Sequence, residues 1–263
     1  MYLSLLFGAA VGVMLGLTGA GGGVLAMPLL VMYLGLTPTE AAPISLLAVA
    51  LAATVGAASA LRKRQVRYRA AIAMALAGAL LSPIGLHLAR LLPARALVVG
   101  FCIVMLIVGA RMLAQVFAPP EAASKNAACP CLRDPATGRF RWTLRCSVSL
   151  AGTGAVAGLF TGMLGVGGGF LIVPALRQFT DVEMPMASAT SLAVIAIVSS
   201  FTSVTTLVSG VHIPLAGWSF IAATVLGLTG GRSIAGRVPA YCSQVVFSLL
   251  VFGIALSWLF KLP

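Results

Sequence analysis

The sequence predicts an all-α protein that crosses a membrane several times. Of its 263 residues, 60% are hydrophobic and only 8% are charged, whereas a soluble globular chain carries about 25% charged residues. Apolar stretches recur along the whole length, and most are near the ~20 residues that a bilayer-spanning helix needs. The N-terminus runs straight into the first of them without a basic region, so we expect no separable secretory signal.

A second observation is that the chain repeats itself after 146 residues. The stretch GAAVGVMLGLTGAGGGVLAMPLL (8–30) aligns with GAVAGLFTGMLGVGGGFLIVPAL (154–176), and 11 of the 23 positions are identical, including every glycine of the first stretch. The alignment continues without a gap to the last residue. We therefore expect two membrane repeats, 1–117 and 147–263, joined by a polar linker, 118–146. Internal repeats are a recurrent feature of secondary transporters.

Each repeat begins with a long apolar stretch that glycines interrupt, at about 2–34 and 148–179. Three further apolar segments follow in each repeat: 42–61, 70–91 and 95–117, then 187–209, 214–236 and 241–260. More than thirty residues of helix, at about 1.5 Å each, would exceed the ~30 Å hydrocarbon core. The interrupted stretch is therefore either one long discontinuous helix or a re-entrant pair of half-helices.

The basic residues help to choose between these arrangements. The net charge is +12, and the basic residues gather in loops, chiefly RKRQVRYR at 62–69 and the linker. In a membrane protein such clusters mark cytoplasmic loops, so we expect no nucleic-acid partner. A re-entrant pair makes the repeats inverted and leaves 14 of the 17 basic residues inside. A single crossing makes them parallel and moves two more basic residues outside, so the inverted arrangement is favoured.

The glycine runs are the first candidate site. A break frees backbone N–H and C=O groups, which hydrocarbon cannot satisfy, so the runs must be buried or line a cavity. The half-helix after each run presents free N–H donors and about half a positive charge at its start. Two such ends near the midplane could face one small anion through the amides of Gly21, Gly22, Gly23, Gly167, Gly168 and Gly169. Close packing is the alternative for the runs, and we assign packing to Gly8, Gly12, Gly16, Gly154, Gly158 and Gly162.

Other candidates surround the runs. Pro28 and Pro174 follow five residues after the last glycine, and each either frees a carbonyl toward the cavity or simply kinks the helix. The hydroxyls of Ser45, Thr190 and Ser191 could donate to an oxyanion, or could form helix–helix hydrogen bonds instead. Arg232 follows GLTGG in a segment rich in small residues and could meet the substrate, although snorkelling to the interface is the ordinary role of such an arginine.

Several functions are disfavoured. All five acidic residues lie in loops or the linker, so we expect no carboxylate relay for protons or cations. No catalytic constellation, metal site or cofactor site is visible, and we expect no enzyme. The linker carries a C-P-C at Cys129 and Cys131, with Cys146 downstream, which is a weak metal or redox signal. A cytoplasmic linker would keep these thiols reduced.

The doubled pattern G-x(3)-G-x(2)-G-x-GGG-x(4)-P, at 12–28 and 158–174, resembles the sulfite exporter TauE/SafE family. The ISL at 44–46 and the TSL at 190–192 are similar to its second-helix pattern. The resemblance covers both repeats but not the linker. It implies a multi-pass protein of the bacterial inner membrane that transports a small inorganic or organosulfur anion, such as sulfite, thiosulfate or an organosulfonate.

We therefore expect a transporter that moves a small anion by alternating access between two pseudo-symmetric halves. An anion channel, or a membrane scaffold or assembly factor that transports nothing, is the alternative. The substrate, the direction, the coupling ion and the oligomeric state stay open.

Overall fold

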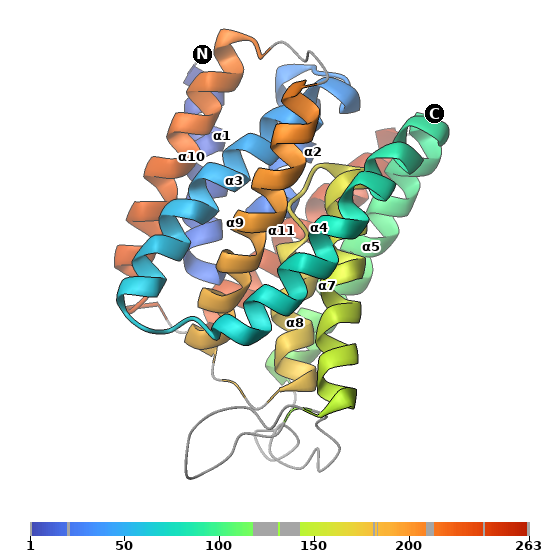
Figure 1. The fold of residues 1–263 in the computed structure, drawn as a ribbon. Coiled ribbons are helices and arrows are strands. Elements are labelled where there is room, and N and C mark those ends of the chain that lie inside the picture. The colour runs from blue at the N-terminus through green and yellow to red at the C-terminus, as the bar shows by residue number, and fades with distance from the viewer. Residues whose placement is uncertain are drawn as a thin grey trace.

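The structure, a computed structural model, describes residues 2–19, 22–117, 131, 143–180, 182, 184–208, 213–238 and 240–261. Within these residues the regular structure is helical (Figure 1), and six helices are long and apolar enough to cross a bilayer. The prediction of an all-α, multi-pass membrane protein is confirmed. The helices are α1 (Tyr2–Thr18), α2 (Gly22–Leu34), α3 (Pro38–Arg62), α4 (Tyr68–Leu91), α5 (Ala94–Phe117), α7 (Leu144–Leu164), α8 (Gly169–Phe179), α9 (Met184–Val208), α10 (Leu215–Ile234) and α11 (Ala240–Lys261).

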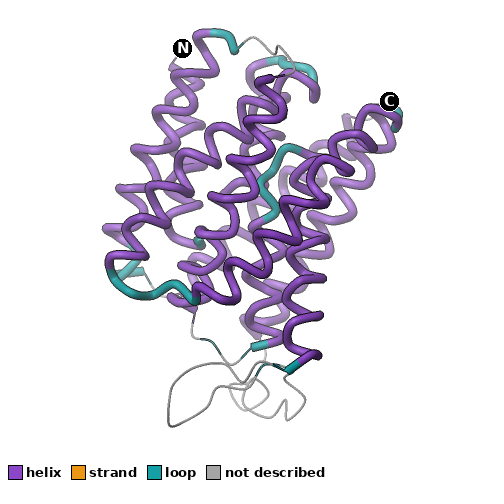
Figure 2. The backbone as a smooth tube through the Cα atoms, viewed as in Figure 1, coloured by secondary structure: helices purple, strands orange, loops and turns teal. Residues whose placement is uncertain are grey.

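Glycines break both interrupted stretches in the same way. The N–H of Gly19 donates to Leu15 O at 2.9 Å, and that of Gly165 donates to Thr161 O at 2.9 Å. Both glycines are left-handed, with φ of 73° and 67°. A left-handed glycine satisfies the last helical carbonyls and ends the helix. The break after α7 appears in Figure 2 as a loop inside the bundle, away from its ends.

Each interrupted stretch folds back on itself. Helices α1 and α2 pack together, as do α7 and α8. In Figure 1, α2 returns to the end of the molecule where α1 begins. At the opposite end, α7 begins and α8 ends. Each stretch is therefore a hairpin of two helices, and the single long helix is not formed.

Each of the main helix pairs joins a helix of the first half to a helix of the second half, and the 146-residue shift relates the pairs to one another. Helix α1 packs along α10 and α7 packs along α4, while α3 and α9 pack against each other, as do α5 and α11. A Cβ at Gly12 would overlap the carbonyl oxygen of Thr224, and one at Gly158 would overlap that of Gly78. A Cβ at each of the other glycines assigned to packing would also lie within 2.7 Å of a backbone oxygen of the same partner helices, so that assignment is confirmed: Gly8, Gly16, Gly154 and Gly162.

Most described basic residues lie at one end of the bundle. The α3–α4 turn, the start of α7, the end of α8 and the connection from α10 to α11 all lie at this end (Figure 1). Arg90 and Arg95 border the α4–α5 turn at the opposite end. The end with the α3–α4 turn is called the basic end below.

Candidate functional site

A cavity of about 340 Å³ opens at the basic end, where α1 stops. It lies between the end of α1, the α3–α4 turn, the starts of α9 and α11, and the end of α10. We call it the α1 cavity. Its lining consists of Gly16, Leu17, Thr18, Lys63, Gln65, Met112, Met184, Pro185, Ser188, Leu192, Arg232, Ala235, Gly236, Val238, Ser243 and Gln244.

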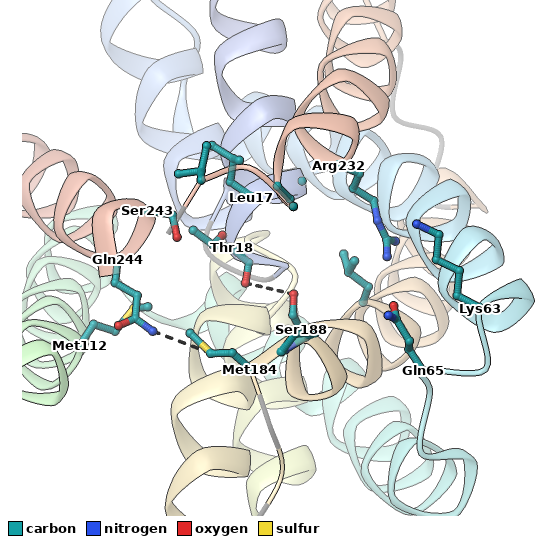
Figure 3. A pocket seen from close by; sticks show the side chains of 16 residues that line it. Leu17, Thr18, Lys63, Gln65, Met112, Met184, Ser188, Arg232, Ser243 and Gln244 are labelled. Carbon is teal, nitrogen blue, oxygen red and sulfur yellow. Dashed lines mark hydrogen bonds between the residues drawn. The ribbon is translucent and has the colours of Figure 1, made fainter. Parts of the chain in front are cut away.

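Two cationic side chains reach one side of the α1 cavity. Figure 3 shows Arg232 and Lys63 near each other, with Gln65 beside them. Arg232 is half-buried, and its Nη1 donates to the carbonyl oxygen of Gly56 on α3. A guanidinium has five donors, so this bond leaves others for a solute.

Uncharged polar groups face them across the cavity. Figure 3 shows Ser243 and Gln244 of α11 on this side, with Ser188 of α9 closer to the middle. The Ser188 hydroxyl donates to Thr18 O over 3.4 Å. None of the described lining residues is acidic, whereas Asp181 and Glu183 lie outside the described residues. The described lining therefore carries formal positive charge and several hydrogen-bond donors, which are features that favour an anion.

A second cavity, of about 260 Å³, lies where α7 stops. We call it the α7 cavity. Its described lining is mainly apolar: Met27, Pro38, Thr39, Ala42, Pro43, Leu46, Leu86, Ala89, Arg90, Leu97, Val98, Gly162, Met163, Leu164 and Thr206. Pro38 lies at one end of α3, whereas Lys63, which lines the α1 cavity, follows its other end. A helix of 25 residues is about 37 Å long, so the two cavities lie toward opposite ends of the bundle.

The two cavities are built from matching positions. Twelve residues of the α1 cavity have their counterpart, 146 positions away, in the lining of the α7 cavity. The geometry is shared but the side chains differ: Arg232, Ser188, Ser243 and Gln244 correspond to Leu86, Ala42, Leu97 and Val98. The described lining of the α1 cavity therefore holds two cations, Arg232 and Lys63, and more polar groups, whereas that of the α7 cavity holds one cation, Arg90, at the position that matches Gly236.

Of the residues that the sequence predicted as a site, Arg232 lines a cavity. The hydroxyls of Ser45 and Ser191 instead donate to backbone carbonyls at the two helix breaks. Ser45 donates to Gly165 O at 2.5 Å, and Ser191 donates to Gly19 O at 2.9 Å. Each hydroxyl reaches the break of the other repeat. Thr190 donates to Met186 O of its own helix at 2.7 Å and lines neither described cavity.

The glycine runs lie in the packed layer beyond the ends of α1 and α7. Gly22 faces backbone atoms of α1, and Gly23 faces the carbonyl oxygen of Val166. Gly167 faces Val49, Ile195 and Ser199, Gly168 faces Ala157 O, and Gly169 is buried at the start of α8. Gly21 lies outside the described residues. Pro28 is buried inside α2 and Pro174 lies half-buried inside α8, and both helices continue past them.

Sequence reasoning missed most of the polar lining. Their positions in the sequence place Lys63 and Gln65 in a cytoplasmic basic cluster. The apolar pattern does not distinguish Ser188, Ser243 and Gln244 from other residues of the apolar segments. A usable signal was present, because the aligned repeats place Ala42, Leu97 and Val98 opposite these last three residues. Within the described residues, no three His, Cys, Asp or Glu side chains gather as a metal site would need.

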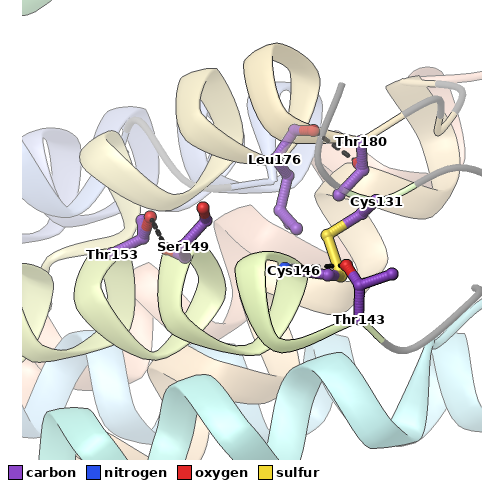
Figure 4. The surroundings of a disulfide bond; sticks show 7 residues. All are labelled: Cys131, Thr143, Cys146, Ser149, Thr153, Leu176 and Thr180. Carbon is purple, nitrogen blue, oxygen red and sulfur yellow. Dashed lines mark hydrogen bonds between the residues drawn. A yellow bond between two sulfur atoms is a disulfide. The ribbon is translucent and has the colours of Figure 1, made fainter. Parts of the chain in front are cut away.

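The linker cysteines differ from expectation. Cys131 and Cys146 form a disulfide (Figure 4), so the expectation that these thiols stay reduced is wrong for this pair. Helix α7 begins inside the expected linker, where Thr143 accepts a hydrogen bond from Cys146 N at 3.2 Å. Cys131 N donates to Phe179 O at 3.3 Å, at the end of α8, and this contact brings the two cysteines together. Cys129 lies outside the described residues.

Comparison with known proteins agrees with this architecture. The model of the sulfite exporter TauE/SafE family matches residues 4–258. Two probable membrane transporter proteins of Xylella fastidiosa, from strains Temecula1 and 9a5c, are 32% and 33% identical over 256 residues, which cover 95% of this chain and 91% of each relative. The probable membrane transporter protein YunE of Bacillus subtilis is 25% identical over 84% of this chain and 82% of its own length. No solved structure matches the chain.

A family match over nearly the whole chain, together with relatives above 30% identity along almost their full length, shows membership. The spanning helices agree with it. The chain therefore belongs to the sulfite exporter TauE/SafE family, and it is a multi-pass transporter of the bacterial inner membrane.

Proposed function

We propose that this transporter carries a small sulfur-containing oxyanion, such as sulfite, thiosulfate or an organosulfonate. The observation that supports this most is the α1 cavity, where Arg232 and Lys63 stand beside hydroxyl and amide groups, with no acidic residue in the described lining. Its volume of about 340 Å³ is near the lower end of the ~300–1,000 Å³ typical of ligand pockets, which suits a small solute. Arginine recognises oxyanions through paired donors.

We propose that transport proceeds by alternating access between two inverted repeats. Two matching cavities at opposite ends of the bundle support this, because exchanging the conformations of the two halves would close one cavity and open the other. The reciprocal bonds from Ser45 and Ser191 support it too, since each half holds the break of the other.

Between the cavities, the anion is coordinated by backbone N–H groups of the runs Gly21–Gly23 and Gly167–Gly169, where α2 and α8 begin. Pro28 and Pro174 leave the carbonyls four residues before them without a helical donor, which loosens these half-helices as the breaks open. In the described conformation Val49 fills this layer, because its side chain lies against both Gly23 and Gly167. The described state is therefore closed between the two cavities.

The test is transport by purified protein in liposomes, with sulfite, thiosulfate, sulfoacetate, sulfate and chloride as the panel. We expect saturable uptake of sulfite, thiosulfate or sulfoacetate, or of more than one of them. We also expect these three anions to compete with one another, and counterflow to occur when the lumen is preloaded. Binding and uptake of none of these three would contradict the substrate class. Flux that does not saturate and shows no counterflow would indicate a channel, and would contradict alternating access.

A further inference from the structure

Two hydroxyls inside α9 are buried without a hydrogen-bond partner: Ser199 Oγ and Ser203 Oγ. Their side chains are 0% and 3% exposed. Other hydroxyls of the same helix behave differently, since Thr190, Thr202 and Thr206 each donate to the carbonyl four residues earlier. A buried hydroxyl without a partner destabilises the fold, so its presence at two successive turns calls for an explanation.

Ser199 stands at the break that precedes α8. A Cβ built on Gly167 would lie 3.1 Å from Ser199 Oγ, and Gly167 is left-handed, with φ of 80°. The next residue, Gly168, is the N-cap of α8 and has no side chain to cap it. The first N–H groups of a helix lack intrahelical partners, so the start of α8 is positively polarised. The unpartnered hydroxyl of Ser199 therefore lies beside a helix start that also has free donors.

The hydroxyls continue from this break to the α7 cavity. Ser199, Ser203 and Thr206 are spaced by four and then three residues, so they share one face of α9. Thr206 lines the α7 cavity. One polar face therefore connects the packed layer, which holds the glycine runs, to the cavity that is otherwise mainly apolar.

The other repeat has no such face. The positions 146 residues earlier, on α3, are Ala53, Ala57 and Ala60, and all three are buried. Alanine packs at these positions of the α3–α9 pair without difficulty. Packing alone therefore does not require hydroxyls on α9.

We propose that this face of α9 is a binding path for the transported oxyanion. The hydroxyls of Ser199 and Ser203 donate to the anion as it passes between the start of α8 and the α7 cavity, and Thr206 borders its passage into that cavity. Hydroxyls suit this task because they donate without a counter-charge that would hold the anion too tightly. The proposal rests on the proposed function, and it adds a one-sided route through the packed layer.

The experiment compares a Ser199→Ala/Ser203→Ala double variant with the wild type in liposomes and in thermal unfolding, with thiosulfate and sulfoacetate as probes. We expect the double variant to unfold at the same or a higher temperature without anion, because two unpartnered hydroxyls are gone. We expect the anion-induced rise in Tm to disappear and uptake to fall at least tenfold. Ser248→Ala is the matched control, since it removes a third buried hydroxyl without a partner, on α11. It should keep wild-type uptake.

Wild-type uptake by the double variant would overturn the proposal, and so would lost uptake accompanied by a lower Tm without anion, because that pattern marks a structural role. A Ser203→Cys variant gives a second readout should the double variant fail to fold. The anionic reagent 2-sulfonatoethyl methanethiosulfonate should label it and block uptake, with sulfoacetate protecting, and a lack of labelling would contradict the path. If the wild type itself moves no panel anion, the proposed function fails instead.

Discussion

The α1 cavity and the α7 cavity share one framework and differ in chemistry. Matching glycines end α1 and α7, and matching positions of α9 and α3, α10 and α4, and α11 and α5 line the two spaces. At four matching positions the α1 cavity carries an arginine, two hydroxyls and an amide where the α7 cavity carries leucine, alanine and valine, and at a fifth the α7 cavity carries Arg90 where the α1 cavity carries Gly236. Matching positions thus line two similar chambers, and the side chains at these positions make the chambers different. The changes below, from the largest expected effect to the smallest, test the shared framework and then the differences.

Disrupting the α1–α10 pair and disrupting the α7–α4 pair should destabilise the fold to the same extent. Gly12→Val and Gly158→Val each place a side chain against the backbone of the neighbouring helix, and we expect each to destabilise the fold by about 3 kcal/mol. Size-exclusion chromatography in detergent should show loss of the monodisperse protein. Gly152→Val is the control, because a Cβ there meets nothing within 4 Å. Failure of only one of the two variants would show that the helix pairs are not equivalent.

Arg232 should account for most of the difference in anion affinity between the α1 cavity and the α7 cavity. Arg232→Leu gives this position the residue of its counterpart, Leu86, and removes hydrogen bonds from a charged donor. Each such bond contributes about 1.5–3 kcal/mol, so apparent affinity should fall about 10- to 100-fold in liposome uptake assays. Arg237→Leu, at the same end but outside the described lining, should have little effect. Equal losses in both variants would point to general surface charge instead.

The disulfide ties Cys131 to the first turn of α7, and the α1–α2 hairpin has no cysteine that could form a counterpart. Cys131 and Cys146 are 15 residues apart, and closing a loop of that length stabilises a fold by about 3 kcal/mol. Cys146→Ser, or treatment with a reductant, should lower Tm in thermal unfolding.

Cys242→Ser removes a free, half-buried cysteine and serves as the control. Identical unfolding of Cys146→Ser and the wild type would show that the bond is not formed in the purified protein. Because the basic end predicts a cytoplasmic, reducing location, an impermeant thiol reagent that labels Cys131 of the Cys146→Ser variant in oriented vesicles would also show which compartment this end faces.

The smallest effect is expected from making the apolar chamber resemble the polar one. Leu97→Ser copies Ser243 into the half-buried matching position of the α7 cavity. One added hydrogen bond of about 0.5 kcal/mol would lower the apparent KM for uptake about twofold. A tenfold change in either direction would mean that the α7 cavity contributes to selection as much as the α1 cavity does.

Much of the fold could be predicted from the sequence because glycine acts locally. Gly19 and Gly165 mark where helices stop, the runs at 21–23 and 167–169 mark where the next helices begin, and the small residues spaced by four mark where helices touch. The cavity lining was harder to predict, because Lys63, Ser188 and Gln244 come from segments distant in the chain and meet only after folding. The disulfide escaped prediction for the same reason, since its formation depends on α8 ending beside the first turn of α7. Arg232 stood out because a charge inside a membrane segment is conspicuous without any partner.

The crossed hydroxyl bonds also impose an order on biosynthesis. Ser45 has already been made when Gly165 leaves the ribosome, so the second break can be secured at once. Gly19 must wait for Ser191, which lies 172 residues later, a delay of about 10–30 s at ordinary translation speeds. During that interval the carbonyl of Gly19 lacks the hydroxyl that donates to it in the folded chain, so the first break is completed only when the second half has been made.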